Sequence, residues 1–299
     1  MPMQSKAPVG MIGLGLMGAA LSARLIDAGI PVLGFDIDAA KCNAFETIGG
    51  ETTDTAGHVA ARCRIIVIAV FNAGQVMSLL DQLAQGGGAS PPLLICTTTC
   101  TPGEIAAIAE RAGRAGLPLV ESPISGTSAE VREGSATALI AGEPEAIAAT
   151  GAILEILCPQ QTRLRKIGDA SRTKLAINLI LQNNRAALAE GIVFAESLGL
   201  DAASFLDAAR RSAAYSKVMD SKGQKMLRRD FAPQSRIAQT LKDAELILHE
   251  ASRRNLSLPM MSAQATLLRA AILLEGPDSD SAAVIAAIRP ARGRTGETR

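Results

Sequence analysis

The chain has 299 residues, a formal net charge of +1 and 48% hydrophobic residues. That length is sufficient for two domains, each with its own hydrophobic core. No uninterrupted apolar run reaches the roughly 20 residues that a membrane-spanning helix needs. The small net charge, together with one Tyr, six Phe and no Trp, argues against nucleic-acid binding, because bases stack on aromatic side chains.

The cysteines and histidines favour an intracellular protein without a metal site. The five cysteines are scattered and form no Cys-x-x-Cys motif: Cys42, Cys63, Cys96, Cys100 and Cys158. We therefore expect reduced thiols and a cytoplasmic location. Only His58 and His249 are available as imidazole ligands, and they lie far apart in the sequence, so we expect no bound metal.

A glycine-rich turn near the N-terminus is the most informative segment. It follows an apolar run at 9–12, precedes a helical pattern at 19–28, and is followed by a second apolar run at 31–35 that ends in Asp36. This order of strand, turn, helix, strand and acid is typical of dinucleotide binding, with the pyrophosphate at the helix N-terminus and the acid at the ribose hydroxyls. The turn reads Gly13-Leu14-Gly15-Leu16-Met17-Gly18.

The same segment is also compatible with a glycine turn that binds no ligand and with a signal peptide. Lys6 precedes a mostly apolar stretch that ends in small residues at 20–23, as a cleavage site does. Four glycines between residues 10 and 18 fit a strand and a turn better than a helical signal core.

The first half of the chain alternates short apolar runs with amphipathic helical patterns, which predicts a doubly wound parallel sheet of the Rossmann type at 1–167. The predicted strands cover 9–12, 31–35, 64–70, 93–96, 118–120, 137–141 and 162–167. The helical patterns after the first lie at 39–48, 76–84, 102–112 and 144–157.

Strand signals end near residue 167, and we expect an all-helical domain at 168–299, entered through one long helix. Its helical patterns lie at 173–198, 202–211, 235–254, 260–274 and 281–288. The final segment, 290–299, is rich in Arg, Gly and Thr and is expected to fray.

Polar residues recur on one line of the long predicted helix. Lys174, Asn178, Gln182 and Arg185 are three or four residues apart, so they share a face. Because the helix is otherwise apolar, we expect it to be buried, and burial lowers the pKa of a lysine toward neutral pH. Lys174 is then a candidate for proton exchange, with Asn178 beside it. The alternative is a lysine that extends to the surface.

Two loops and one ion pair are weaker candidates. Ser125, the amide after Gly126 and the Thr127 hydroxyl can together surround a compact carboxylate, although a Ser-Gly-Thr sequence is most often only a turn. The threonine run at 97–99 is close enough to a predicted strand to approach a nicotinamide. Lys242-Asp243 would ordinarily be a solvated charge pair.

Taken together, these motifs resemble the β-hydroxyacid dehydrogenase family, over nearly the whole chain. The glycine turn fits the family's motif, and Lys242-Asp243 fits its late Lys-Asp pair. Residues 121–127 match the Asp-x-Pro-x-Ser-Gly-Gly loop, and residues 168–178 match the family's segment of a Gly-x-Gly turn followed by a Lys and an Asn on a helix. The order and spacing of four motifs are more specific than any one of them.

The resemblance implies an NAD-dependent oxidoreductase that transfers a hydride to or from a small hydroxy acid. Lys174 would be the general acid/base and Asn178 would orient the substrate. Ser125, Gly126 and Thr127 would bind the substrate's carboxylate. Asp36 would favour NAD over NADP, because its charge repels a 2′-phosphate. The cofactor would contact Gly13, Leu14, Gly15, Leu16, Met17, Gly18, Asp36, Val70, Phe71, Asn72, Thr98 and Lys242, the last of which would also contact the substrate.

The chain also departs from the family pattern. Glu121 replaces an Asp, Thr127 replaces the second Gly of Ser-Gly-Gly, and residues 169–170 interrupt the Gly-x-Gly. These differences bear on the identity of the substrate more than on the type of reaction. The alternatives are an NADP-dependent semialdehyde or imine reductase and an NAD(H) sensor without turnover. The long apolar helices predict a homodimer or homotetramer, with no nucleic-acid or membrane partner.

Overall fold

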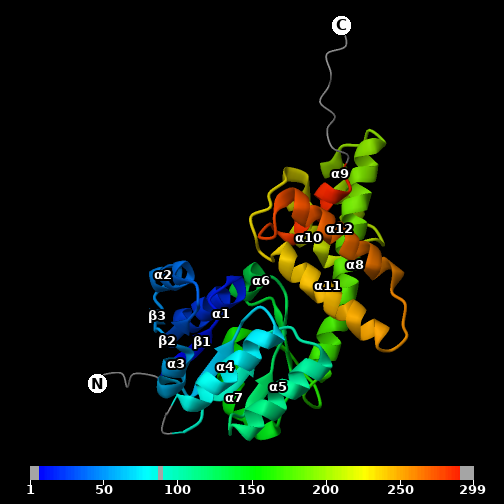
Figure 1. Ribbon diagram of the computed structural model, residues 1–299. Helices are drawn as coiled ribbons and strands as arrows, with labels where there is room; N and C mark the ends of the chain where they lie inside the picture. The colour runs from blue at the N-terminus through cyan, green and yellow to red at the C-terminus, as the bar shows by residue number, and fades with distance from the viewer. Residues whose placement is uncertain (1–6, 87–89, 290–299) are drawn as a thin grey trace. The chain divides into compact units, whose positions relative to one another are not determined.

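The computed structural model describes residues 7–86 and 90–289. The chain divides into two compact units, Met1–Lys174 and Leu175–Arg299, and the boundary falls inside one long helix (Figure 1). The expectations for Lys6 and for 290–299 concern residues outside the described part of the chain. Each unit has its own hydrophobic core.

The first unit is built on a six-stranded parallel sheet with the strand order β3-β2-β1-β4-β5-β6. This is the order of dinucleotide-binding domains, in which the order of the strands reverses between β1 and β4. The predicted doubly wound parallel sheet is therefore confirmed. Its strands are β1 Val9–Ile12, β2 Val32–Phe35, β3 Glu51–Thr52, β4 Ile65–Ile68, β5 Leu93–Cys96 and β6 Leu119–Glu121.

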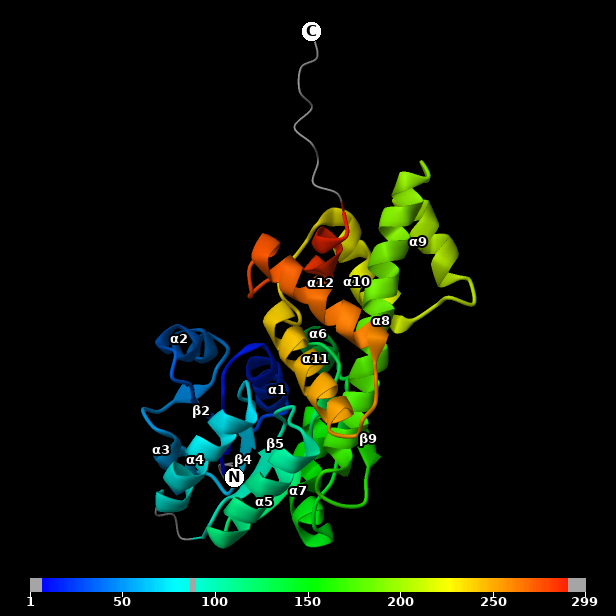
Figure 2. The ribbon, with the colours of Figure 1, turned by 45° about the vertical axis from the view of Figure 1, so that its right-hand side comes forward.

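Helices cover both faces of this sheet (Figures 1 and 2). Side chains alternate between the faces of a strand, so Met11 packs with one helix layer and Ile12 with the other. The layer beneath Met11 consists of α1 Leu16–Asp27 and α7 Pro144–Leu157. The opposite layer consists of α3 Ala56–Arg62, α4 Ala73–Gln85 and α5 Pro102–Arg114. A further helix, α2 Ala39–Thr47, follows β2.

The last two predicted strands belong to a separate small sheet, not to the large parallel one. Beyond Pro123 the chain continues in the same direction as β6, and β7 Ile124–Ser125 pairs antiparallel with β8 Thr137–Ile140, just as Glu121 pairs with Ala141. After α7, β9 Gln160–Arg163 joins β8 in parallel. Proline has no amide hydrogen to continue a ladder, which accounts for the break after β6.

The second unit contains helices throughout its described part, as predicted. The longest helix, α8, enters it from the first unit, and α9 lies along the C-terminal half of α8 (Figure 2). The helix α10 was not predicted, because its sequence is mostly polar and contains a glycine. The elements are α8 Asp169–Ser197, α9 Ala202–Arg210, α10 Lys217–Arg228, α11 Ile237–Ser252, α12 Pro259–Glu275 and a 3-10 turn, η1, at Ser281–Ala287.

A buried ion pair fixes the loop between α10 and α11. Lys222 Nζ donates to both carboxylate oxygens of Asp280 at 2.8 Å, and both side chains are almost fully buried. Asp280 also accepts from the amides of Gln234, Ser235 and Ala282. Burial alone would raise the pKa of Asp280, but Lys222 and these amides hold it below its ordinary value.

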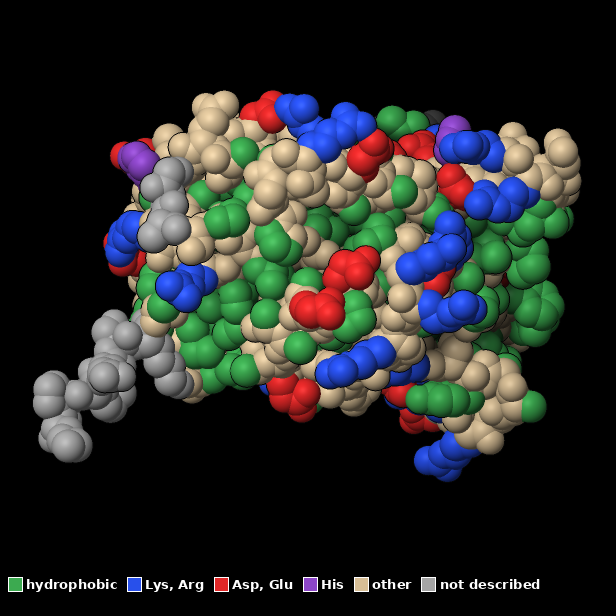
Figure 3. Space-filling model, turned by 90° about the horizontal axis from the view of Figure 1, so that it is seen from below, with side chains coloured by type: hydrophobic (Ala, Val, Ile, Leu, Met, Phe, Trp, Pro, Cys, Tyr) green, Lys and Arg blue, Asp and Glu red, His purple; other side chains and the backbone are tan. Residues whose placement is uncertain are grey.

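Charged side chains of both signs are mixed with apolar ones on the face shown in Figure 3. Surface pairs such as Arg62–Glu51 and Arg111–Asp81 match basic to acidic groups locally. Among the residues that the structure describes, no helix combines the length and the apolar character that a bilayer crossing requires.

Candidate active site

The glycine turn is shaped by close backbone contacts. Gly13 has φ +91°, and a Cβ there would lie 2.6 Å from the Ala69 carbonyl oxygen. A Cβ on Gly18 would lie 1.8 Å from the Gly13 carbonyl oxygen. A Cβ on Gly15 would instead meet nothing within 4 Å. The first and third glycines thus permit the turn, and the second leaves open space at the N-terminus of α1, which suits a pyrophosphate.

Asp36 is bonded to this turn. It follows β2, and its Oδ2 accepts from the Leu14 amide at 2.8 Å. Its Oδ1 accepts from the Asp38 amide at 3.0 Å and lies 3.4 Å from Lys41 Nζ. The side chain is only 8% exposed. The carboxylate therefore lies beside the turn, where a ribose hydroxyl would need it. The sequence did not reveal that Lys41 balances its charge.

The ends of β4 and β5 complete the same edge of the sheet. Thr98 Oγ1 donates to the Val70 carbonyl oxygen at 3.0 Å, which ties the two strand ends together. Asn72 caps α4 by accepting from the Gln75 amide at 2.9 Å, and Gln75 in turn accepts from the Phe71 amide. Because the strands are parallel, their carboxyl ends share one edge. The structure thus places the expected nucleotide-binding residues of the first unit at one edge of the sheet, whereas Lys242 belongs to the second unit.

The Ser125–Thr127 loop differs from the expectation in one respect. Gly126 has φ +152°, and Thr127 is the N-cap of the short helix α6 Ser128–Glu133. The Thr127 amide donates to Glu130 Oε2 at 2.7 Å, while Thr127 Oγ1 accepts from the Glu130 amide at 3.2 Å. The amide after Gly126, expected as a carboxylate donor, is therefore already engaged. The Thr-x-x-Glu pattern could have revealed this capping box from the sequence.

Glu121 at the end of β6 is only 1% exposed, and its two oxygens accept from two different amides. Oε2 accepts from Gly168 and Oε1 from Ser171, both at 2.6 Å. Burial raises the pKa of Glu121, and the hydrogen bonds from Ser171, Gly168 and Ala170 oppose that rise. The sequence showed Glu121 only as a departure from the family pattern, because its partners lie almost 50 residues away.

The predicted polar line on α8 is buried along its whole length. Lys174, Asn178, Gln182 and Arg185 are 2–6% exposed, so Lys174 does not extend into solvent. Lys174 is the last residue of the first unit, whereas the other three belong to the second. Burial also lowers the pKa of Arg185 to about 10, while the carboxylates of Asp280 and Asp243 favour its charged form.

Asp243 organises the remaining predicted residues in the second unit. Asn178 Nδ2 donates to Asp243 Oδ2 at 2.9 Å, and Lys242 Nζ lies 3.0 Å from Asp243 Oδ1. The Lys242 side chain is only 14% exposed, so this is not the solvated charge pair that its sequence suggested. Gln182 Nε2 donates to the Thr240 carbonyl oxygen at 3.1 Å, a second link between α8 and α11.

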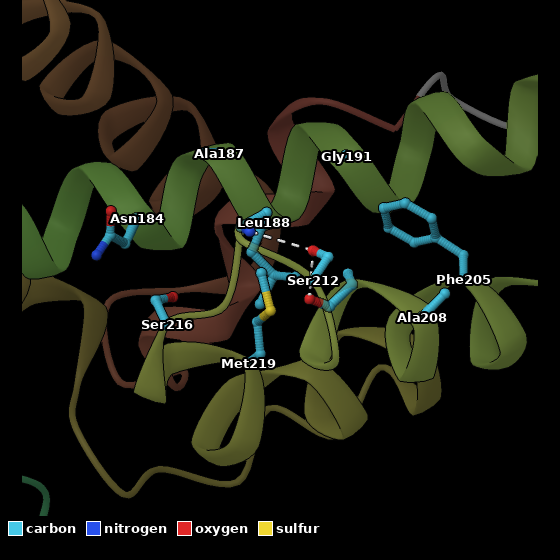
Figure 4. Close-up of a pocket in the computed structure, with 11 residues that line it drawn as sticks. Asn184, Ala187, Leu188, Gly191, Phe205, Ala208, Ser212, Ser216 and Met219 are labelled. Atoms are coloured by element: carbon cyan, nitrogen blue, oxygen red, sulfur yellow. Dashed lines mark hydrogen bonds between the residues drawn. The ribbon is translucent and has the colours of Figure 1, made fainter.

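An apolar cavity of about 460 Å³ lies elsewhere in the second unit, between α8, α9 and α10 (Figure 4). Leu188, Phe205 and Met219 supply much of its lining, with the polar side chains of Asn184 and Ser216 at its wall. None of the predicted site residues lines it.

Two family models match the chain. One describes the NAD binding domain of 6-phosphogluconate dehydrogenase and covers residues 8–164. The other describes the NAD-binding domain of NADP-dependent 3-hydroxyisobutyrate dehydrogenase and covers residues 168–288. Together with the glycine turn and the sheet order, these matches define an oxidoreductase that binds a pyridine nucleotide.

Individual relatives agree with the models. The chain is 27% identical to L-threonate dehydrogenase of Cupriavidus necator, over 92% of this chain and 94% of the relative. It is 31% identical to a probable 3-hydroxyisobutyrate dehydrogenase-like protein of Arabidopsis thaliana, over 76% of each chain. A crystal structure of 3-hydroxyisobutyrate dehydrogenase from Salmonella typhimurium has the same fold, with a TM-score of 0.84, 23% identity and coverage of 93% of this chain and 98% of that one. The chain belongs to the β-hydroxyacid dehydrogenase family.

The contacts of the three glycines predict different effects of an added methyl group. Gly15→Ala should fold normally but weaken nucleotide binding at least about tenfold, or ~1.4 kcal/mol, because the methyl enters the open space. Gly18→Ala should lower the thermal midpoint by several degrees, because its methyl overlaps a carbonyl oxygen. Gly151→Ala, also with nothing near its Cβ, is the matched control. Calorimetric titration with NADH and thermal melts measure both effects. Unchanged affinity in Gly15→Ala would contradict the placement of the pyrophosphate.

Proposed function

We propose that the protein transfers a hydride between NAD and a small hydroxy acid, forming or consuming the corresponding semialdehyde or keto acid. The observation that carries this proposal is the buried Lys174, one turn beyond a helix start that is bonded to the nucleotide-binding sheet through Glu121. The names of the relatives, L-threonate dehydrogenase and 3-hydroxyisobutyrate dehydrogenase-like protein, support the substrate class.

Lys174 acts as the general acid/base. A nicotinamide cofactor, when bound, would supply the hydride acceptor for the oxidation and the hydride donor for the reduction. In the oxidation, neutral Lys174 takes the hydroxyl proton as the C–O bond becomes a double bond, and in the reduction the protonated amine returns it. Asn178 orients the substrate, and its bond to Asp243 holds its amide in one orientation on α8.

The substrate's carboxylate binds to the loop of Ser125, Gly126 and Thr127. The Thr127 amide is engaged by Glu130, so the hydroxyls of Ser125 and Thr127 are the donors we assign to the carboxylate. The Thr127 hydroxyl accepts from the Glu130 amide and keeps its proton for another acceptor. The positive charge of Lys242 attracts the substrate and the cofactor.

We assign residues 1–167 to cofactor binding, and residues 168–299 to substrate binding and oligomer formation. This division agrees with the limits of the two family models.

Removing the amine of Lys174 should slow turnover strongly without weakening the binding of the cofactor. Lys174→Ala is expected to lower kcat by about 10²–10⁴-fold, the usual contribution of a positioned acid/base, with the Kd for NADH nearly unchanged. Lys166→Ala, an exposed lysine nearby in the chain, is the control. Absorbance of the reduced nicotinamide is followed with a panel of 3-hydroxyisobutyrate, glycerate, L-threonate and 3-hydroxypropionate. Full activity of Lys174→Ala would exclude this role for the lysine.

We further propose NAD as the preferred cofactor. The Asp36 carboxylate opposes a 2′-phosphate, whereas Lys41 beside it reduces that opposition. Asp36→Asn keeps an acceptor for the Leu14 amide and removes the charge, so the NAD-over-NADP ratio of kcat/KM should fall at least about tenfold. Asp38→Asn, which loses a carboxylate 3.5 Å from the same lysine, is the control. A ratio that already favours NADP in the wild type would overturn the preference.

Homo-oligomer formation, as a dimer or tetramer, is also proposed. Phe194, Leu198 and Leu200, at the end of α8 and just beyond it, are 54–65% exposed, and large apolar patches usually mark interaction sites. Light scattering after size exclusion should give at least twice the chain mass of 30.9 kDa. The mass of a single chain at all concentrations would contradict this proposal.

Two alternatives are distinguished by the same assay, and one of them has support in the comparisons. An NADP-dependent reductase is supported by the second family model, whose description names an NADP-dependent enzyme. An NAD(H) sensor would bind the nucleotide and show no turnover with any acid of the panel.

We also propose a cytoplasmic location, because no disulfide joins any two of the five cysteines, all of which lie in the described part of the chain.

A further inference from the structure

Glu121 links the nucleotide-binding sheet to the start of α8. Its backbone is fixed on two sides: it pairs with Cys96 of β5, and it exchanges two hydrogen bonds with Ala141, at 2.8 and 2.9 Å. Its side chain then reaches the amides of Gly168 and Ser171. A side chain anchored in this way transmits the position of β6 to the helix.

The first amides of a helix have no partners within the helix, and a buried helix start needs acceptors from elsewhere. In α8 one carboxylate serves two of these amides, and its negative charge is favourable at a helix N-terminus. Ser171 is also 2% exposed, so water does not replace this carboxylate easily.

The cap lies close to the residue proposed to carry the proton. Lys174 follows Ser171 by three residues, a rise of about 4.5 Å along the helix. Both belong to the first unit, as does Glu121. A small shift of the helix start therefore moves the Lys174 amine by a similar amount, and misplacement by about 1 Å is enough to slow a reaction strongly.

We propose that Glu121 is a positioning residue, which acts on the reaction by fixing the start of α8 and thereby the Lys174 amine. This inference rests on the proposed role of Lys174. It also gives a physical meaning to the glutamate at a position where the family pattern has an aspartate. Because the backbone of β6 is fixed, a side chain shorter by one carbon, about 1.5 Å, would not reach both amides at 2.6 Å.

Glu121→Gln is the main variant, because it keeps the length of the side chain but its amide nitrogen cannot accept a hydrogen bond. Glu121→Asp, which keeps the charge and loses the reach, is the second variant should the first not fold. The matched control is Glu104→Gln. Glu104 Oε2 accepts from the Thr101 amide at 2.7 Å at the start of α5, so it is also a glutamate that caps a helix of the first unit.

The test combines kinetics with hydrogen exchange. Glu121→Gln should lower kcat at least tenfold while the Kd for NADH stays within twofold, and Glu104→Gln should leave both within twofold. In the Lys174→Ala background, Glu121→Gln should cost less than a further twofold, because its effect passes through the missing amine. Amides of 168–174 should exchange at least tenfold faster in Glu121→Gln than in wild type or Glu104→Gln.

The outcomes separate the two proposals. If the wild type turns over and Glu121→Gln loses no more activity than Glu104→Gln, or loses an equal factor with and without Lys174, the positioning role is wrong and the proposed function stands. If the wild type oxidises none of the acids and reduces none of their aldehydes, the proposed function fails and the positioning role falls with it. Unchanged exchange at 168–174 would overturn the cap itself.

Discussion

The two hydrogen bonds from the start of α8 to the Glu121 carboxylate are the constraint on which the geometry of the site depends. They join the carboxyl end of β6 to the helix that carries Lys174. The cost of burying a carboxylate is offset by these donors, which oppose the rise in the pKa of Glu121. The nucleotide-binding sheet therefore determines where Lys174, the residue that we propose to transfer the proton, lies within the first unit.

Buried carboxylates with several fixed partners also stabilise the second unit. Asp280 accepts from Lys222, from two loop amides and from the Ala282 amide of η1. Asp243 accepts from Asn178 and forms an ion pair with Lys242. Such groups are stable in an apolar core only when their partners are fixed. Asn178, Gln182 and Arg185 of the polar line on α8 are thus part of the structure of the second unit.

The parts of the fold that depend on local patterns could be predicted from the sequence. The glycine turn, the parallel sheet and the long helix follow from spacing, and α7 was predicted at its observed limits. The small second sheet was not predicted, because β7 has only two residues and its partner β8 follows beyond an intervening helix. Long-range bonds such as Glu121 to Gly168 leave no local signal. The capping box of Thr127 and Glu130 did leave one, which the apparent family loop obscured.

The most direct test of hydride transfer follows the hydrogen of the carbinol carbon into the cofactor. The purified protein is incubated with NAD and each candidate acid carrying deuterium at the carbinol carbon, and the reduced cofactor is isolated and weighed by mass spectrometry. We expect one of the acids to deliver its deuterium to the nicotinamide ring, in a reaction that Lys174→Ala slows strongly. Tight binding of NADH with no deuterium in the cofactor from any acid would contradict hydride transfer and favour a sensor.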